Sequence, residues 1–236
     1  MIHVKQLKKL YGEKQVLAID ALEIPSGQSF GLVGNNGAGK TTLFSALLDL
    51  IRLNQGTITN QEMDVSSSET WKQFTTAFLD ETFLIGYLTP EEYFYFIGDL
   101  RGVSHSDVDA FVGQFEDFFH GEVLKQKKYL RDLSKGNQKK VGIVGALIGS
   151  PSVIVLDEPF ANLDPSTQIR LKELLREWSQ QKGVTLLISS HDLQHVTEVC
   201  ERIVVLDKGE VVKDIKTQTQ TLKDLEAFFT QKSQEG

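Results

Sequence analysis

Gly34-Asn35-Asn36-Gly37-Ala38-Gly39-Lys40-Thr41-Thr42 satisfies the pattern G-x-x-x-x-G-K-[ST] in full. The apolar run 29–33 before it is typical of a buried strand, and residues 43–48 after it are typical of a helix. A glycine-rich loop between a strand and a helix is the context in which this pattern binds phosphate. The stretch therefore predicts an α/β fold organised around a phosphate-binding loop.

The residue types of this loop suit a polyphosphate ligand. Its glycines allow backbone conformations closed to other residues, so that main-chain N–H groups can approach phosphate oxygens, and the helix dipole adds positive charge. We expect Lys40 to reach the β- and γ-phosphates, Thr41 to ligate Mg²⁺ and Thr42 to contact the α-phosphate. The predicted nucleotide contacts of the loop are Asn35, Gly37, Ala38, Gly39, Lys40, Thr41 and Thr42.

Composition excludes several classes of protein. The chain has 236 residues, of which 40% are hydrophobic and 24% charged, as expected for one large or two small globular domains. Its net charge of −7 gives no overall basic surface for nucleic acid or an anionic membrane, so we expect no nucleic-acid partner.

Cysteine content and hydropathy indicate the compartment. Cys200 is the only cysteine, which excludes a disulfide framework within one chain and fits a reducing compartment. The N-terminus has no apolar signal core, and no stretch approaches the roughly 18 uninterrupted apolar residues of a membrane helix. We therefore expect a cytosolic or peripheral protein.

The first part of the chain is predicted to be mainly β. Strands are expected over 2–10, 16–24, 57–59 and 74–79, with turns between them. Tyr11, in the first turn, could stack on an adenine ring or pack against the hairpin, and the residues alone favour packing.

Residues from 85 to about 150 have a helical character. Thr89-Pro90-Glu91-Glu92 is a helix start with a capping box, and further helices are predicted over 107–120 and 137–148. The aromatic run 93–97 is interpreted as core. Positive charge gathers in 125–140, either as a solvated face or as a surface for polyphosphate, and Ser134 and Gly136 at a helix start favour the second interpretation.

Parallel-sheet signals return after residue 150. The apolar strand 153–156 ends in Asp157, which can hold Mg²⁺ through water, and Glu158, the candidate general base for an attacking water. His191, at the end of the strand 184–188, is interpreted as a polar sensor, because its spacing with His195 is only a weak metal signal. A helix over 164–182, strands over 202–206 and 210–214, a short helix over 222–229 and a disordered end complete the prediction.

With these motifs in order, the sequence resembles the ATP-binding subunit of ABC transporters, of an exporter-like type. The resemblance covers residues 2–214, nearly the whole chain. Residues 34–42 resemble the Walker A loop, 153–158 Walker B with the catalytic glutamate, 133–137 the signature, 162–164 the D-loop, and His191 the switch histidine. Tyr11 matches the aromatic residue that stacks on adenine, which favours that role.

The resemblance implies the fold class and the domain organisation. The fold is a P-loop NTPase core, a mixed sheet with flanking helices, joined by an N-terminal antiparallel β subdomain and an inserted α-helical subdomain. We expect a single ABC ATPase domain over 1–236, with the core and β subdomain at about 1–84 and 151–215, the helical signature subdomain at about 85–150, and a short C-terminal helix and tail at 216–236.

The resemblance also implies a mechanism. Two subunits clamp two ATP molecules head to tail, so Ser134 and Gly136 would face the partner's ATP, while Lys40, Glu158 and His191 serve catalysis. Closure and hydrolysis would drive a transmembrane permease from the cytoplasmic side of the membrane. The second ATP-binding subunit is an identical chain in the simplest case, and a heterodimer is the alternative. The expected cofactors are ATP and Mg²⁺.

Two departures from the family pattern bear on this mechanism. Lys135 and Asn137 replace the middle glycine and the glutamine of the signature, which adds a charge and leaves a shorter side chain. Glu81 stands where the Q-loop glutamine belongs, and we expect it to ligate Mg²⁺ together with Thr41 and Asp157. Glu81→Gln is predicted to keep ATPase activity within about tenfold, a barrier change of roughly 1.4 kcal/mol.

A soluble function in the same superfamily is the alternative at this point. Such a protein would act on a cytosolic assembly or on a ribosomal machine. Members that act in translation generally carry two ATPase units in one chain, and members that repair DNA have long coiled-coil insertions. This chain has neither feature, whereas a role on an assembly scaffold stays open.

Overall fold

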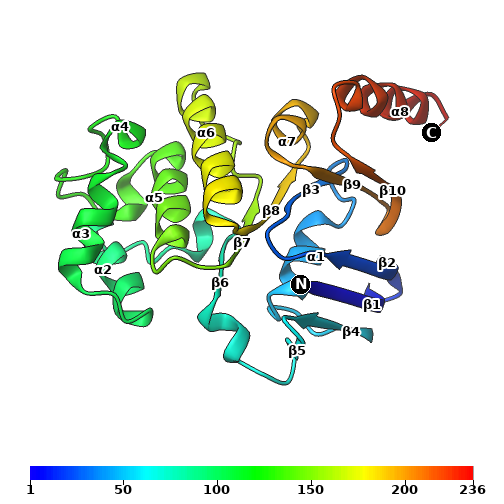
Figure 1. Ribbon diagram of the computed structural model, residues 1–236, viewed down its shortest axis with the longest axis horizontal. Helices are drawn as coiled ribbons and strands as arrows, with labels where there is room; N and C mark the ends of the chain where they lie inside the picture. The colour runs from blue at the N-terminus through cyan, green and yellow to red at the C-terminus, as the bar shows by residue number, and fades with distance from the viewer. Residues whose placement is uncertain (236) are drawn as a thin grey trace.

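Two β-sheets and the helices around them make up the computed structural model, which describes residues 1–235 apart from the side chains of residues 181 and 233–235 (Figure 1). The antiparallel sheet has the strand order β2-β1-β4-β5. Its strands are β1 (Ile2–Tyr11), β2 (Lys14–Ile24), β4 (Gln55–Asn60) and β5 (Met63–Asp64).

The larger sheet has the strand order β10-β9-β3-β8-β7-β6 and is parallel except for β10. Every residue of β3, β7 and β8 is buried, because helices or the other sheet cover both faces, as their continuous apolar sequences predict. The strands are β3 (Ser29–Val33), β6 (Thr75–Phe78), β7 (Val153–Asp157), β8 (Thr185–Ser190), β9 (Arg202–Asp207) and β10 (Glu210–Lys216).

Two hydrophobic cores lie on opposite faces of the larger sheet. Along β7, Val153 and Val155 point into the core shared with the antiparallel sheet and α1, whereas Ile154 and Leu156 point into the core beneath the other helices. The helices are α1 (Lys40–Leu47), α2 (Pro90–Leu100), α3 (His105–Gly113), α4 (Glu116–Phe119), α5 (Lys135–Leu147), α6 (Pro165–Lys182), α7 (Leu193–Val199) and α8 (Thr221–Glu235). None of the helices in the described part is long and apolar enough to cross a membrane.

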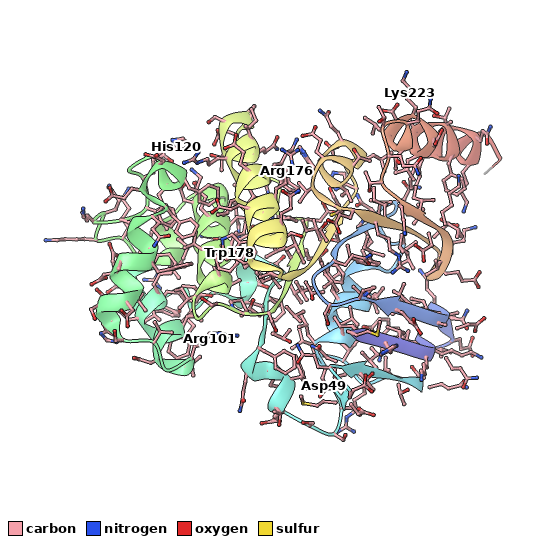
Figure 2. The ribbon with its side chains drawn as sticks, in the orientation of Figure 1. Asp49, Arg101, His120, Arg176, Trp178 and Lys223 are labelled. Carbon is pink, nitrogen blue, oxygen red and sulfur yellow. The ribbon has the colours of Figure 1, made fainter. Side chains whose placement is uncertain are left out.

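The helices α2 to α5 gather at the end of the molecule farthest from the antiparallel sheet (Figure 1). Aromatic and polar contacts attach them to the core. The ring of Phe111 meets the indole of Trp178 on α6 edge to face at 6.2 Å. The guanidinium of Arg101 at the end of α2 donates to the carbonyls of Gln73 and Thr75, and Trp178 and Arg101 are both labelled in Figure 2.

The structure corrects two predicted helices. The expected helix 107–120 is two helices: α3 begins at His105 after the N-cap Ser104, and bonds from Gln114 and Phe115 to carbonyls three residues back end it before α4. The C-terminal helix was expected to end at 229 before a disordered stretch, but α8 extends to Glu235. Leu225 packs in the core and Lys232 pairs with Asp207, and these contacts stabilise the longer helix, while residue 236 lies outside the described residues.

Gly142→Ala should destabilise the fold. Helix α5 packs against β6, where a Cβ at Gly142 would lie 2.1 Å from the ring of the buried Phe78. We expect the free energy of unfolding to fall by about 1–3 kcal/mol in chemical denaturation. Gly113→Ala is the matched control, because a Cβ at this helical position meets nothing within 4 Å, and it should raise stability by up to about 1 kcal/mol. Equal effects of both substitutions would contradict this packing.

Candidate active site

The phosphate-binding loop connects β3 to α1 at the carboxyl end of the larger sheet. Gly37 and Gly39 have φ angles of 81° and 107°, which favour glycine. A Cβ at Gly34 would lie 2.3 Å from the carbonyl oxygen of Leu206, and one at Gly39 would lie 3.0 Å from that of Val16. The loop therefore depends on glycine both for its backbone conformation and for its close packing on neighbouring strands.

The first turn of α1 has main-chain N–H groups that lack intrahelical acceptors. Gly39 is the N-cap and has no side chain that could accept from them. The first helical N–H to find an intrahelical acceptor is that of Leu43, which donates to Gly39 at 2.8 Å. The N–H groups of the first turn and the helix dipole together favour an anion at this place.

Lys40, Glu158 and His191, the three predicted catalytic residues, converge beside this loop. The Lys40 ammonium is buried, donates to the Gly34 carbonyl at 2.7 Å and lies 3.4 Å from Glu158 Oε1. His191 Nδ1 lies 2.9 Å from Glu158 Oε2. Each oxygen of the Glu158 carboxylate thus has one partner, and the half-exposed His191 closes the group on the solvent side.

Thr41 and Asp157 form a second polar pair next to it. The Thr41 hydroxyl donates to Asp157 Oδ2 at 2.5 Å, and the Ser189 hydroxyl donates to Oδ1. Burial raises the pKa of Asp157 above its usual value, although both hydroxyl donors oppose the shift. Hydroxyl and carboxylate oxygens are the ligands that Mg²⁺ prefers.

Thr41 and Asp157 supply a small set of oxygen donors. Among the described residues, no three His, Cys, Asp or Glu side chains gather closely enough to bind a metal ion. Mg²⁺ commonly takes one or two protein ligands and completes its shell with substrate phosphates and water, and a hydroxyl with one carboxylate fits that pattern. His191 and His195, whose spacing is a weak metal signal, have different partners: His191 Nδ1 contacts Glu158, whereas the His195 ring packs against Phe160 with the ring centres 4.6 Å apart and the planes tilted by 36°.

The backbone of Glu158 is strained and held by its neighbours. Its φ of 46° is unusual for a residue other than glycine and costs on the order of 1 kcal/mol. The Glu158 N–H donates to the carbonyl and hydroxyl oxygens of Ser189 at 3.2 and 3.1 Å. The Lys139 ammonium donates to the Glu158 carbonyl at 2.8 Å. These bonds aim the Glu158 side chain at Lys40 and His191.

Sequence reasoning missed Lys139 and Ser189. The signal for Ser189 was available, since it ends a strand next to the one that carries Asp157. Lys139 lay in the charge run 125–140, which was interpreted as a surface, yet it is buried. It also lies 3.4 Å from the carboxylate of Glu81, so the predicted metal ligand Glu81 is paired with a lysine in this structure.

The signature residues lie at the start of α5. Ser134 is the N-cap and accepts from the Asn137 N–H at 3.2 Å, and Ser134 and Lys135 are exposed. A Cβ at Gly136 would lie 2.8 Å from the Asn162 carbonyl, so glycine is needed there. The Asn137 amide donates inward to Glu122 at 3.2 Å.

Ser134 and Gly136 do not reach the chain's own phosphate loop. Among the described residues, no hydrogen bond connects either of them with residues 34–42. Tyr11, the predicted adenine contact, lies at the end of β1 and is 53% exposed, with the Lys9 ammonium 4.7 Å from its ring centre. Its face is therefore accessible to a ligand as well as to Lys9.

Asp157→Asn should stabilise the nucleotide-free protein at neutral pH. The folded pKa of Asp157 is raised, so its ionised form destabilises the fold as pH rises through that pKa. An asparagine keeps the partnership with the two hydroxyls without the charge. We expect a higher melting temperature at pH 7. The gain should vanish below about pH 4, where aspartic acid is protonated in both states, and a lower melting temperature at pH 7 would contradict the assignment.

Comparison with known proteins identifies the family. Residues 17–161 match the family described as ABC transporter. An uncharacterized ABC transporter ATP-binding protein of Bacillus subtilis, YhaQ, is 33% identical over 244 residues, covering 99% of this chain and 75% of the relative.

Solved structures agree with this assignment. The structure of an ATP-binding subunit of an ABC transporter is 27% identical, has a TM-score of 0.83, and is matched over 98% of this chain and 93% of its own. A dimeric ATP-binding cassette, MJ0796 bound to ADP and Pi, shares the fold with a TM-score of 0.82 at 23% identity, over 92% of this chain and 99% of its own. The chain therefore belongs to the ABC transporter family, as one of its ATP-binding and ATP-hydrolysing subunits.

Proposed function

We propose that Glu158 is the general base of ATP hydrolysis and that Lys40 and His191 set its state. The observation that carries the proposal is the contact of one Glu158 oxygen with Lys40 at 3.4 Å and of the other with His191 at 2.9 Å. A γ-phosphate bound at the loop would compete for the Lys40 ammonium. The released Glu158 oxygen could then accept the proton of an attacking water, while His191 keeps the carboxylate in place.

Thr41 and Asp157 are the residues that would hold Mg²⁺ next to the phosphates. The ion neutralises phosphate charge when it is bound. Ser189 orients the Asp157 carboxylate through a hydrogen bond, and Thr41 is already within 2.5 Å of it. Glu81 is the third candidate ligand, and Tyr11 is the candidate platform for the adenine.

A second ATP-binding subunit completes the site. Ser134 and Gly136 lie at the exposed start of α5, where helix N–H groups can meet a phosphate from outside the chain. The exposed ammonium of Lys135 adds positive charge there. The dimeric state of MJ0796 supports a second subunit. In the proposed pair the two chains are arranged head to tail, and each contributes these residues to the ATP of the other.

A transmembrane permease is the proposed partner at a second surface, around Phe83. A hollow of about 320 Å³ lies between the residues that follow α1, the segment around β6 and Tyr93 of α2, and its lining is apolar apart from Lys72, with Phe83 62% exposed and Leu50 52% exposed at its rim. Exposed apolar side chains around a hollow favour a protein partner. Through this contact the chain would be a peripheral protein on the cytoplasmic side of the membrane. The lining includes Leu48, Leu50, Trp71, Phe83, Leu84 and Tyr93.

Two substitutions separate binding from hydrolysis. Lys40→Ala should abolish ATP binding, because it removes the ammonium that meets the phosphates. Glu158→Gln should bind ATP, lose at least about 100-fold in turnover, the usual contribution of a general base, and accumulate as a dimer. Size-exclusion chromatography with excess MgATP, alongside a phosphate-release assay, checks both. A Glu158→Gln protein that stays monomeric with bound ATP would count against the head-to-tail pair.

Phe83→Asp should detach the chain from its permease. A charge at the rim of the hollow would be desolvated by an apolar partner, which weakens binding. In cells, we expect the tagged variant to leave the membrane fraction and to lose a multispanning protein that co-purifies in stoichiometric amount with the unmodified chain. Ile169→Asp is the matched control, since Ile169 is similarly exposed but lies on α6 outside the hollow. Unchanged co-purification of Phe83→Asp would refute this docking site.

A further inference from the structure

A buried ion pair connects the segment Glu81–Phe83 with α5. The side chains of Lys139 and Glu81 are only 6% and 11% exposed, and Nζ lies 3.4 Å from Oε1. This buried Oε1 accepts no hydrogen bond from any residue that the structure describes. Because an unpaired charge is unfavourable in such a place, each of these two residues depends on the other.

The same lysine is attached to the catalytic strand end. Its ammonium donates to the Glu158 carbonyl at 2.8 Å. Strands β6 and β7 are parallel neighbours with Phe78 opposite Leu156, so Glu81 and Glu158 follow strand ends that lie side by side (Figure 1). Through Lys139, Glu81 is therefore connected to the backbone of Glu158, whose side chain contacts Lys40 in the phosphate-binding loop.

The balance of charge at this edge is unfavourable for a polyphosphate. The charged side chains that gather at the ends of β6 and β7 and on the adjoining parts of the loop and α5 are the carboxylates of Asp80, Glu81, Asp157 and Glu158 and the ammonium groups of Lys40, Lys135 and Lys139. Every carboxylate without a compensating cation repels the phosphates of ATP. Lys139 is the cation in direct contact with Glu81.

We propose that Lys139 is a positioning residue that compensates the charge of Glu81, so that a carboxylate can stand beside the phosphates without weakening ATP binding. The inference rests on the proposed site for ATP at the loop. In this proposal α5 contributes to the chain's own nucleotide site through Lys139, while the residues at its start contact the ATP of a partner subunit. The bond to the Glu158 carbonyl keeps the compensating charge at the strand end.

A purely structural role of the ion pair would produce a different pattern of ATP affinities among the variants. If Lys139 and Glu81 only held α5 in place, removing either one would disturb the site in the same way, and ATP affinity would fall in both variants. Charge compensation instead predicts shifts of opposite sign. Losing the carboxylate leaves an excess positive charge near the phosphates, whereas losing the ammonium leaves an excess negative charge.

The test compares Glu81→Gln, Lys139→Gln and the double variant in their affinity for fluorescently labelled ATP without Mg²⁺. We expect Glu81→Gln to bind ATP roughly three- to tenfold more tightly and Lys139→Gln to bind it more weakly by a similar factor. The double variant should return to within about twofold of the unmodified chain. Lys139→Arg keeps the charge and should bind nearly as well as the unmodified chain.

Thermal unfolding without nucleotide supplies a second readout. The double variant should melt at a higher temperature than either single variant, because each single variant leaves one buried charge unpaired whereas the double variant leaves none. Glu69 and Lys72 form an exposed pair at 3.1 Å and are the matched control, in which Glu69→Gln and Lys72→Gln should have small and additive effects. If Lys139→Gln fails to fold, Glu81→Gln and Lys139→Arg decide the affinity test.

Two results would overturn the inference. One is a lower ATP affinity in both Glu81→Gln and Lys139→Gln. The other is a change of melting temperature in the double variant that equals the sum of the changes in the two single variants. An unmodified chain that binds no ATP would refute the proposed nucleotide site itself. Tight ATP binding by the unmodified chain without opposite shifts in the variants would refute only the role of Lys139.

Discussion

The parallel alignment of β3, β7 and β8 is the constraint on which the site depends. Because their carboxyl ends meet at one edge, the phosphate-binding loop, Asp157 with Glu158, and Ser189 are brought together without any loop having to reach for them. Helices and the second sheet bury these strands on both faces, which fixes their register. The positions of Thr41 opposite Asp157 and of Lys40 opposite Glu158 follow from that register.

Local sequence therefore predicted much of the site. A fully apolar strand that ends in two carboxylates, and a glycine-rich loop after another such strand, both carry their meaning in consecutive residues. The resemblance to ABC transporter subunits predicted the fold, and the comparisons confirm the family and the α/β architecture. The roles of Tyr11, Glu81 and the signature residues concern molecules outside this chain, so they stay predictions.

The misjudged features are those set by tertiary contacts. A run with several lysines indicates a solvated face, but α5 is buried from Asn137 onward, and within it Lys139 is paired with Glu81. The partner of Lys139 is Glu81, 58 positions earlier, and no local pattern relates the two. The length of α8 was likewise decided by packing and ion pairing with distant residues, whereas the break between α3 and α4 is local, in bonds to carbonyls three residues back.

The contacts of α5 connect the proposed permease site with the residues proposed to hydrolyse ATP. Gly142 rests against Phe78 on β6, Lys139 joins Glu81 to the Glu158 carbonyl, and Gly136 rests against the Asn162 carbonyl. Phe83, at the rim of the proposed permease site, is only two residues from Glu81. In the proposed arrangement, a movement of the permease that shifts Phe83 would act on Glu81 through the same short turn, and then either Lys139 follows and strains its bond to Glu158 or the buried pair opens. The first alternative changes the backbone that aims the proposed general base, and the second exposes an unpaired Glu81 carboxylate, so a single buried ammonium links the proposed permease site with the catalytic strand end.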